Sequence, residues 1–391
     1  MRILTCLYYY RPHYSGLTVY TERLARTLAS RGHRVTVLTS RYDRSLPRLE
    51  QIDGVEVRRM RVAFRLSKGP VMPSFLLRGW ALAREHDVVH LHVPQLDAAP
   101  MALLAKLLGK PIVLTYHCDL RLPASPVNFL ASLASDTANR LTLSLADIAI
   151  TNTRDYAESS YLLTRYLPKM EFISPPIDAP DPHPETMEAL RKRAGISAGE
   201  VVIGMAARLA TEKGAEILAR AMPMVLQRYP GARVLHVGQN EAVLGEQAYA
   251  RRLQPLLKAL GPRWMPLGVL SAEDMAAFYT LCDITVLPSL NSTESFGMVQ
   301  VESMAYGTPV VASDLPGVRQ PTAMTGMGLA VPPGDPNALA DGICRILAAP
   351  ERFRRDPQEI RTMFSSSSVA ERYEALFTRL LERQAPRAGN R

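Results

Sequence analysis

The chain has 391 residues, of which 46 are Lys or Arg and 37 are Asp or Glu, so its formal net charge is +9. This length predicts two or three domains of roughly 100–200 residues each. Hydrophobic residues make up 47% of the chain and charged residues 21%, a balance that excludes a mostly disordered or fibrous protein.

The cysteines and the apolar runs indicate the compartment. The four cysteines form no C-x-x-C pair, so we expect reduced thiols and no zinc cluster: Cys6, Cys118, Cys282 and Cys344. No apolar run reaches the roughly 18–20 residues of a spanning helix, and Met1 leads into a strand pattern rather than a signal peptide. We therefore expect a cytoplasmic protein.

The first half of the chain alternates apolar strand runs with helical patterns. A strand is expected at residues 3–8, and a helix follows at 19–31. Further strands are expected at 35–39, 55–57, 88–91, 112–115, 148–150 and 171–173. Strands that alternate with helices predict a parallel sheet covered by helices on both faces.

A proline-rich break separates this half from a second one. Residues 174–182 hold four prolines, which can continue neither a helix nor a central strand, so we predict an interdomain linker there. The alternation then restarts, with strands expected at 201–204, 233–237, near 264, at 284–287 and 310–312, and helices near 214–228, near 242–260, at 272–281 and at 297–306.

This pattern predicts an α/β protein of two Rossmann-like domains, residues 1–174 and 175–368, that face each other across a cleft. In open α/β sheets ligands bind outside the carboxyl ends of the strands, so the site is expected at those edges. Residues 369–383 predict an amphipathic helix that packs back onto the first domain.

Two glutamates define the most specific motif of the sequence. Seven residues separate Glu294 from Glu302 in the stretch ESFGMVQVE, which Pro288-Ser289 precedes and GTPVVASD follows. In this motif the chain resembles the retaining GT-B glycosyltransferases of family 4, the group 1 type, which use nucleotide-sugar donors. The resemblance covers nearly the whole chain and is strongest over residues 200–336.

The resemblance implies a role for each part of the motif. Glu302 would hold the nucleotide ribose and Glu294 the donor sugar, since a carboxylate can accept hydrogen bonds from vicinal hydroxyls. The amides of Phe296, Gly297 and Met298 would lie at a helix N-terminus that favours anions, and Gly297 would allow a ligand to approach closely. The alternative is a helix with one acid at its N-terminus and one solvated acid.

A second motif supplies positive charge. The segment GMAARLATEKG, from Gly204 to Gly214, is similar to the family motif G-R-L-x-x-x-K-G. Arg208 and Lys213 align with its two cations, which would stabilise the charge that develops on a diphosphate leaving group. A surface ion pair with Glu212 is the alternative.

The first domain contributes a turn and a strand end. The loop 10–17 keeps only Gly16 where the family has a Gly-rich turn whose amides touch the donor phosphate or the acceptor. His117 follows a strand and, by resemblance, would contact a hydroxyl of the donor sugar. Asp119 would approach the acceptor hydroxyl, although both residues could instead be satisfied within a core.

No metal and no cofactor are expected, so the nucleotide-sugar is a substrate. The sequence has no D-x-D pair beside a strand and no P-loop, and His90 and His92 lack further ligands at metal-binding spacing. UDP is favoured over GDP by family frequency, and Asn291 and His117 would help to select the sugar. The residues expected near the base are Gln239, Asn240, Val269 and Leu270.

The net charge belongs to the first half. Residues 1–174 hold 23 basic and 14 acidic residues, whereas 175–391 hold 23 of each. Between 58 and 84 no acid occurs and the basic residues are Arg58, Arg59, Arg61, Arg65, Lys68, Arg78 and Arg84. Their mixture with aromatic and aliphatic residues suits an anionic membrane or a lipid-linked acceptor, and no nucleic-acid module accompanies it. A merely solvated basic surface is the alternative.

Together these features predict a metal-independent, retaining hexosyltransferase. It would bind a nucleotide-diphosphate sugar in the second domain and an acceptor glycan, glycolipid or small molecule in the first. Peripheral contact with the inner face of the membrane is expected through 58–84. A nucleotide-sugar 2-epimerase on the same fold and a non-catalytic nucleotide-sugar-binding protein are the alternative functions.

Overall fold

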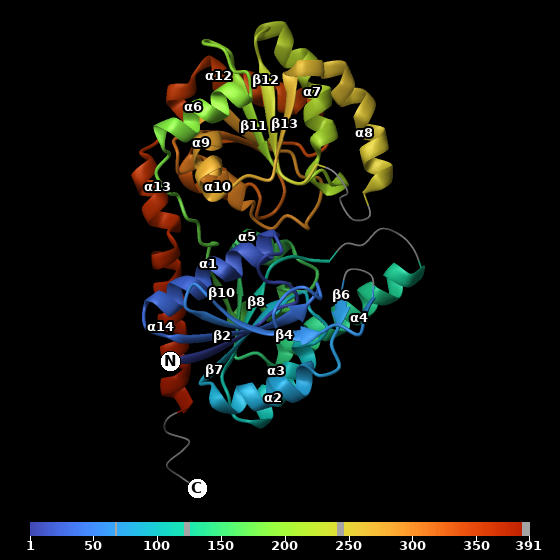
Figure 1. Cartoon of the computed structure of the whole chain (residues 1–391), viewed down its shortest axis with the longest axis vertical. Coiled ribbons are helices and arrows are strands. Elements are labelled where there is room, and N and C mark those ends of the chain that lie inside the picture. Colours follow the sequence, from blue (N-terminus) through green and yellow to red (C-terminus); the bar gives the residue numbers. More distant parts are fainter. Residues whose placement is uncertain (67–68, 121–125, 241–245, 385–391) are drawn as a thin grey trace. The chain divides into compact units, whose positions relative to one another are not determined.

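The computed structural model describes residues 1–66, 69–120, 126–240 and 246–384. The chain divides into two compact units, shown in Figure 1. Unit 1 comprises Met1–Pro176 and Phe364–Arg391, and unit 2 comprises Ile177–Met363. Among the described residues, no helix is long and apolar enough to cross a membrane.

Unit 1 is built on an eight-stranded sheet in which only the edge strand β3 is antiparallel to its neighbour. The strand order is β10-β9-β8-β7-β1-β2-β4-β3, and β5 and β6 form a separate antiparallel pair. The strands are β1 (Arg2–Cys6), β2 (Arg34–Arg41), β3 (Leu49–Ile52), β4 (Val55–Arg61), β5 (Phe64–Leu66), β6 (Gly69–Val71), β7 (Val88–Val93), β8 (Ile112–Tyr116), β9 (Ile148–Thr151) and β10 (Met170–Phe172). Every residue of β7 is buried, as expected for a central parallel strand covered on both faces.

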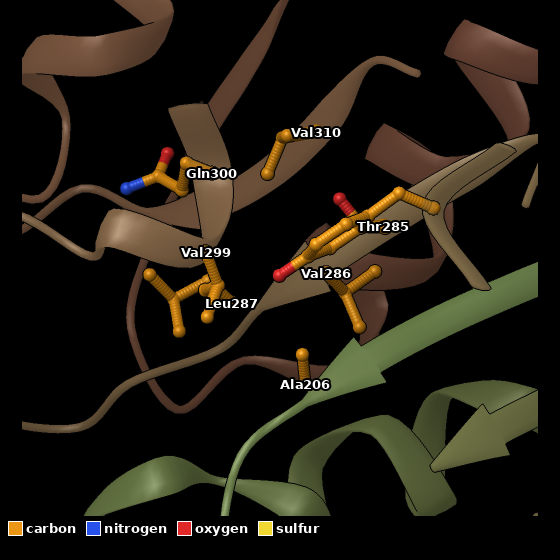
Figure 2. Close-up of a pocket in the computed structure, with 8 residues that line it drawn as sticks. Ala206, Thr285, Val286, Leu287, Val299, Gln300 and Val310 are labelled. Atoms are coloured by element: carbon orange, nitrogen blue, oxygen red, sulfur yellow. The ribbon is translucent and has the colours of Figure 1, made fainter. Parts of the chain in front are cut away.

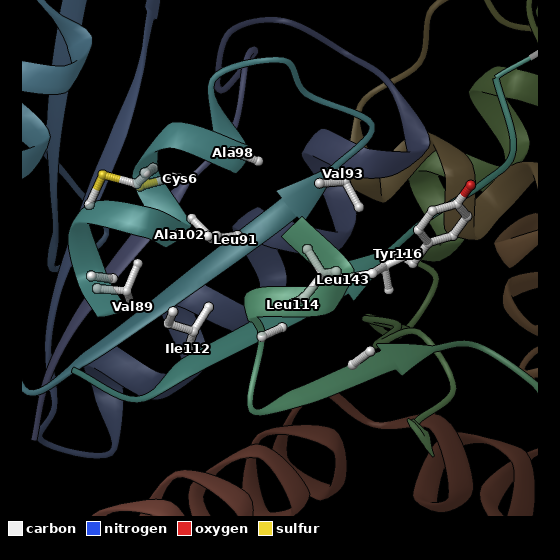
Figure 3. Close-up of a cluster of buried hydrophobic side chains, with 14 of the residues drawn as sticks. Cys6, Val89, Leu91, Val93, Ala98, Ala102, Ile112, Leu114, Tyr116 and Leu143 are labelled. Carbon is white, nitrogen blue, oxygen red and sulfur yellow. The ribbon is translucent and has the colours of Figure 1, made fainter. Parts of the chain in front are cut away.

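The helices of unit 1 cover the sheet, and its main core lies against α3 and α4. Figure 3 shows side chains of β1, β7 and β8 meeting Ala98 and Ala102 of α3 and Leu143 of α4. The last helix, α14, packs beside α1, where the hydroxyls of Tyr373 and Tyr20 are 2.7 Å apart. The helices are α1 (Gly16–Ser30), α2 (Phe75–Glu85), α3 (Ala98–Leu107), α4 (Pro126–Leu145), α5 (Arg154–Ser159), η1 (Thr164–Lys169) and α14 (Ser366–Gln384).

Unit 2 repeats the plan with six parallel strands in the order β13-β12-β11-β14-β15-β16. These are β11 (Val202–Ala206), β12 (Arg233–Val237), β13 (Trp264–Gly268), β14 (Ile284–Leu287), β15 (Val310–Ser313) and β16 (Gly328–Val331). One core contains side chains of α7, α8 and α12, and another contains side chains of α6 and α9. The helices are α6 (Pro184–Arg193), η2 (Thr211–Lys213), α7 (Ala215–Arg228), α8 (Gln247–Leu260), η3 (Gly261–Arg263), α9 (Ala272–Leu281), α10 (Met298–Met304), α11 (Gln320–Thr325), α12 (Pro336–Ala348), η4 (Pro350–Phe353) and α13 (Pro357–Phe364).

The predicted α/β architecture with parallel sheets is confirmed. The structure adds elements that the strand and helix patterns did not predict, namely β3, the β5–β6 pair, α6, β16, α11, α12 and α13. The helix predicted at 297–306 is shorter, and the one predicted at 369–383 begins earlier, at Ser366.

Candidate functional site

The loop after β11 brings both predicted cations of unit 2 next to carboxylates. Arg208 forms an ion pair with Glu212. An ion pair with Glu212 is the alternative to diphosphate binding that the sequence left open for this motif. Lys213 instead forms an ion pair with Glu294, with 2.6 Å between Nζ and Oε2. Two residues from separate motifs therefore meet at one place, at the carboxyl ends of the adjacent strands β11 and β14.

The Lys213–Glu294 pair is shielded enough for its charges to matter. The two side chains are 22% and 17% exposed, whereas Arg208 is 41% exposed. A partly buried ion pair is screened less by salt and water than a surface pair. Each of the two residues therefore neutralises the other.

Glycine is required at position 297 by the backbone. Gly297 is the N-cap of α10 with φ at 79°, a left-handed conformation, and a Cβ there would collide with the side chain of Leu287. From the sequence we expected this glycine to allow a ligand to approach closely. The structure instead explains it by the backbone conformation and by the closeness of Leu287. The amides of Phe296, Gly297 and Met298 thus lie where the chain enters the first turn of α10.

The segment before α10 is held firmly from within. The Gln300 amide donates hydrogen bonds to the carbonyls of Phe296 at 2.8 Å and Val318 at 2.9 Å. Figure 2 shows Gln300 and Val299 of α10 above Leu287 of β14, around a pocket with essentially no room for a water molecule. Close packing therefore fixes the approach to α10 and the glutamate that precedes it.

The second glutamate of the motif has a partner that the sequence did not suggest. Glu302 lies within α10, as predicted, and its Oε2 accepts a hydrogen bond of 2.9 Å from the hydroxyl of Tyr279 in α9. Tyr279 lies in an apolar helix pattern, and no spacing rule connects it with Glu302.

In unit 1, His117 belongs to a buried histidine cluster that also contains His90 and His92. His92 Nδ1 lies 2.8 Å from His117 Nε2, and His90 Nε2 lies 2.7 Å from Thr115 Oγ1. Burial lowers the pKa of both His90 and His117 to about 3. His117 is thus neutral and anchored to the interior, and its contact with a sugar hydroxyl stays a prediction. The pairing of the parallel strands β7 and β8 explains the cluster, because their register places His92 opposite Thr115.

The cluster makes the stability of the fold depend on pH. Unfolded histidines titrate near pH 6.5, whereas His90 and His117 in the fold stay neutral down to about pH 3. As the pH falls below about 6.5, each of these histidines becomes protonated in the unfolded chain but stays neutral in the folded protein. Each histidine therefore lowers the free energy of unfolding by about 1.4 kcal/mol per pH unit. Urea unfolding between pH 7.5 and 5 is expected to show this decline.

The variant His90→Gln is the test of that prediction, because glutamine can keep a hydrogen bond to Thr115 but does not titrate. Its free energy of unfolding should fall with pH about 1.4 kcal/mol per unit less steeply than that of the unchanged chain. The same slope in both proteins would contradict the assignment of a neutral, buried His90.

Asp119 is enclosed within unit 1. It is 2% exposed, and its Oδ1 accepts hydrogen bonds from the Tyr116 hydroxyl at 2.8 Å and the Ser160 hydroxyl at 2.7 Å. The structure therefore favours the core role that was weighed for it over contact with an acceptor.

The remaining predicted binding residues lie on loops and helix starts. Gly16 is the first residue of α1, and Ser15 before it caps the helix by accepting a hydrogen bond from the Thr18 amide. Val269 is 62% exposed and its neighbour Leu270 is buried. Gln239 and Asn240 follow β12 after Gly238, and Asn291 Oδ1 accepts hydrogen bonds from Thr293.

No group of three or more His, Cys, Asp or Glu side chains suited to a metal ion occurs in the part of the chain that the structure describes. Of the two predicted cations, Lys213 lies at Glu294 and Arg208 lies at Glu212. Lys213 is the last residue of the short η2 turn, and Gly214 joins that turn to α7.

The basic segment is only partly a surface. Arg59 is buried and forms an ion pair with Glu50, so it cannot serve an anionic partner, which corrects that part of the prediction. Arg58 pairs with Glu56 at 2.8 Å. Lys68 lies outside the described residues. The exposed basic residues are Arg61, Arg65, Arg78 and Arg84, and the exposed apolar ones beside them in sequence are Phe64, Leu76, Leu77 and Trp80.

Comparison with known proteins gives the same class in both units. Residues 15–173 match the family model "Glycosyl transferase 4-like domain", and residues 186–361 match "Glycosyl transferases group 1". The chain is similar to the Anabaena protein HepE in its complex with UDP-glucose, at a TM-score of 0.73 and 21% identity over 97% of this chain and 99% of that one. The two family matches give the class as glycosyltransferase, and the likeness to this structure gives the fold as GT-B.

The chain belongs to the group 1 glycosyltransferases. It is 30% identical to the D-inositol 3-phosphate glycosyltransferase of Mycobacteroides abscessus, over 91% of this chain and 82% of the relative. It is 27% identical to the phosphatidyl-myo-inositol mannosyltransferase of Mycobacterium leprae, over 92% of this chain and 89% of the relative.

Proposed function

We propose that the chain is a retaining hexosyltransferase that moves a hexosyl unit from a nucleotide-diphosphate sugar, with UDP favoured over GDP, to an acceptor hydroxyl. The observation that carries this proposal is the Lys213–Glu294 pair at 2.6 Å, one turn before the α10 helix that carries Glu302. Family membership favours transfer over epimerisation or mere binding.

In this proposal, the donor replaces the internal ion pairs. The diphosphate takes Arg208 and Lys213 as partners, the sugar hydroxyls take Glu294, and the ribose takes Glu302. The two cations stabilise the charge that develops as the bond between the sugar and the diphosphate breaks, a role that a metal ion fills elsewhere.

The proposed reaction proceeds on one face of the sugar. The acceptor hydroxyl oxygen forms a bond to the anomeric carbon on the side from which the diphosphate leaves. The hydroxyl proton passes to the departing diphosphate oxygen, so that no enzymic nucleophile is needed and the anomeric configuration is retained.

A nucleotide-sugar screen tests the function. Thermal unfolding is measured with UDP-, GDP-, ADP- and TDP-sugars, and one of these donors is expected to raise the midpoint. The stabilising donor is then incubated with D-inositol 3-phosphate and with phosphatidyl-myo-inositol, the acceptors suggested by the named relatives, and the product anomer is assigned by NMR. A donor that is epimerised without any acceptor, or no stabilisation by any of the four, would refute the proposal.

We also propose that unit 1 contacts anionic membranes peripherally, at the inner face, through α2 and its surroundings. Leu77 is 78% exposed and Trp80 is 37% exposed on α2, and Arg78 and Arg84 are exposed on the same helix. At an anionic bilayer, exposed apolar side chains can insert into the interface, and basic side chains beside them are attracted to the charged headgroups. A lipid-linked acceptor would be reached from that position.

The double variant Leu77→Ser, Trp80→Ser is expected to sediment several-fold less with vesicles of phosphatidylcholine and phosphatidylglycerol than the unchanged chain does. The control is Met324→Ser, which removes another exposed apolar side chain, in unit 2. Vesicles of phosphatidylcholine alone should retain little of any protein. Equal sedimentation of the double variant and the unchanged chain would argue against this surface.

A further inference from the structure

The hydroxyl of Tyr279 holds the carboxylate that is proposed to bind ribose. Tyr279 is 2% exposed, and it donates its hydrogen bond of 2.9 Å to Glu302 Oε2 across the contact between α9 and α10. A hydrogen bond to an ionised acceptor is stronger and more directional than one between neutral groups. It therefore fixes the plane in which the carboxylate can receive other donors.

The tyrosine is itself locked in place. Its backbone carbonyl accepts a hydrogen bond of 2.8 Å from Thr308 Oγ1, and its ring stacks on that of Tyr306 with 5.9 Å between centroids and 16° between planes. The Tyr306 hydroxyl in turn donates to the carbonyl of Pro180 at 2.8 Å. Because both rings are held in this way, the Tyr279 hydroxyl oxygen is expected to stay beside Glu302 when a ligand binds.

A ribose makes a specific demand on such a carboxylate. Its 2′- and 3′-hydroxyls are vicinal and lie in a fixed relation to each other, so the acceptor must present its oxygens at one angle. A glutamate side chain on a helix has several rotamers, and an inward anchor selects among them. Holding a binding group rigid in advance raises affinity, because less freedom is lost on binding.

We propose that Tyr279 is a positioning residue that orients Glu302 toward the ribose hydroxyls and thereby gives the site its preference for ribonucleotides over deoxyribonucleotides. This inference rests on the proposed function, in which Glu302 holds the ribose of the donor. Tyr279 lies outside both motifs of unit 2, and the inference gives it an effect on which nucleotide binds.

The test compares two ribonucleotides with their 2′-deoxy forms in four proteins and in one double variant. Calorimetric titration gives the dissociation constants of UDP and 2′-deoxy-UDP, with GDP and 2′-deoxy-GDP as a second pair, for the unchanged chain, Tyr279→Phe, Glu302→Gln and Tyr249→Phe. Tyr249 is the matched control, since it is also buried in unit 2 and its hydroxyl accepts a hydrogen bond from the Glu216 amide. Tyr249→Phe is expected to bind every nucleotide as the unchanged chain does.

Tyr279→Phe is expected to bind the ribonucleotide about tenfold more weakly and the deoxyribonucleotide within about twofold of the unchanged chain. Glu302→Gln should lose the same preference, and adding Tyr279→Phe to it should change little further, since both act on one interaction. Equal weakening of both nucleotides by Tyr279→Phe would show a packing role only, and an unchanged preference would also overturn the inference. Both results leave the proposed function standing, whereas an unchanged chain that binds neither UDP nor GDP would overturn both.

Discussion

Glu294→Gln is expected to lower the turnover of sugar transfer about a hundredfold or more while UDP binds as well as before or more tightly. The loss follows because the carboxylate is needed at the donor sugar in the transition state. The gain follows because Glu294 pairs with Lys213 at 2.6 Å, and a neutral amide would compete less with a diphosphate for that cation. Steady-state transfer gives kcat, and calorimetric titration gives the Kd of UDP.

The matched control for this variant is Glu216→Gln. Glu216 is also a carboxylate of unit 2 that binds cations, with Arg220 at 2.8 Å and Arg252 at 3.0 Å, but it lies on α7 and takes no part in the proposed site. It should change neither turnover nor the Kd of UDP. Near-normal transfer by Glu294→Gln would remove Glu294 from the reaction, and a large loss of UDP affinity would contradict the view that the ion pair competes with the ligand.

Gly214→Ala is expected to lower the free energy of unfolding by about 3 kcal/mol or more. Gly214 has φ at 70°, and a Cβ at this position would fall on the backbone carbonyl oxygen of Pro288. The loop that carries Arg208 and Lys213 would therefore have to separate from the chain that leaves β14 toward Glu294. We also expect the affinity for UDP to fall, because that separation breaks the alignment of the cations with the glutamate.

Gly199→Ala separates the two causes of this destabilisation. Gly199 has φ at 80°, nearly the same conformation, but nothing lies within 4 Å of where its Cβ would be. This control should lose only about 1–2 kcal/mol, the cost of a left-handed conformation for an alanine. Urea unfolding measures both variants, and equal losses would mean that the close approach to Pro288 has no energetic role.

Most of the fold follows from local patterns, since buried parallel strands are continuous apolar runs and helices end at glycine or proline. What the patterns missed was short or polar. The strand β3 alternates partly exposed residues at an edge, and β16 holds two half-buried residues beside an exposed one. Elements of this kind are fixed by their neighbours, so their own sequence carries little signal.

The site residues that belong to sequence motifs could be predicted. The contacts between these residues could not, because they depend on tertiary packing. The two glutamates and two cations could be identified, but their pairing, Lys213 with Glu294 and Arg208 with Glu212, depends on which strands lie side by side. Tyr279 could not be found, because a tyrosine in an apolar helix is ordinary. Arg59 appeared to be surface charge, yet it is buried beside Glu50, since alternation in β4 turns it inward.

Unit 1 can be completed only when the C-terminal helix α14 has been synthesised. Unit 1 is interrupted in sequence, because α14 is synthesised only after all of Ile177–Met363. During translation, at roughly 5–20 residues per second, unit 2 can fold while the first strands still lack the helix that supplies Tyr373 to Tyr20 and Thr115. All of unit 2 is therefore synthesised before unit 1 is complete, and a chain that stops short of α14 lacks the Tyr373 ring that packs against His90.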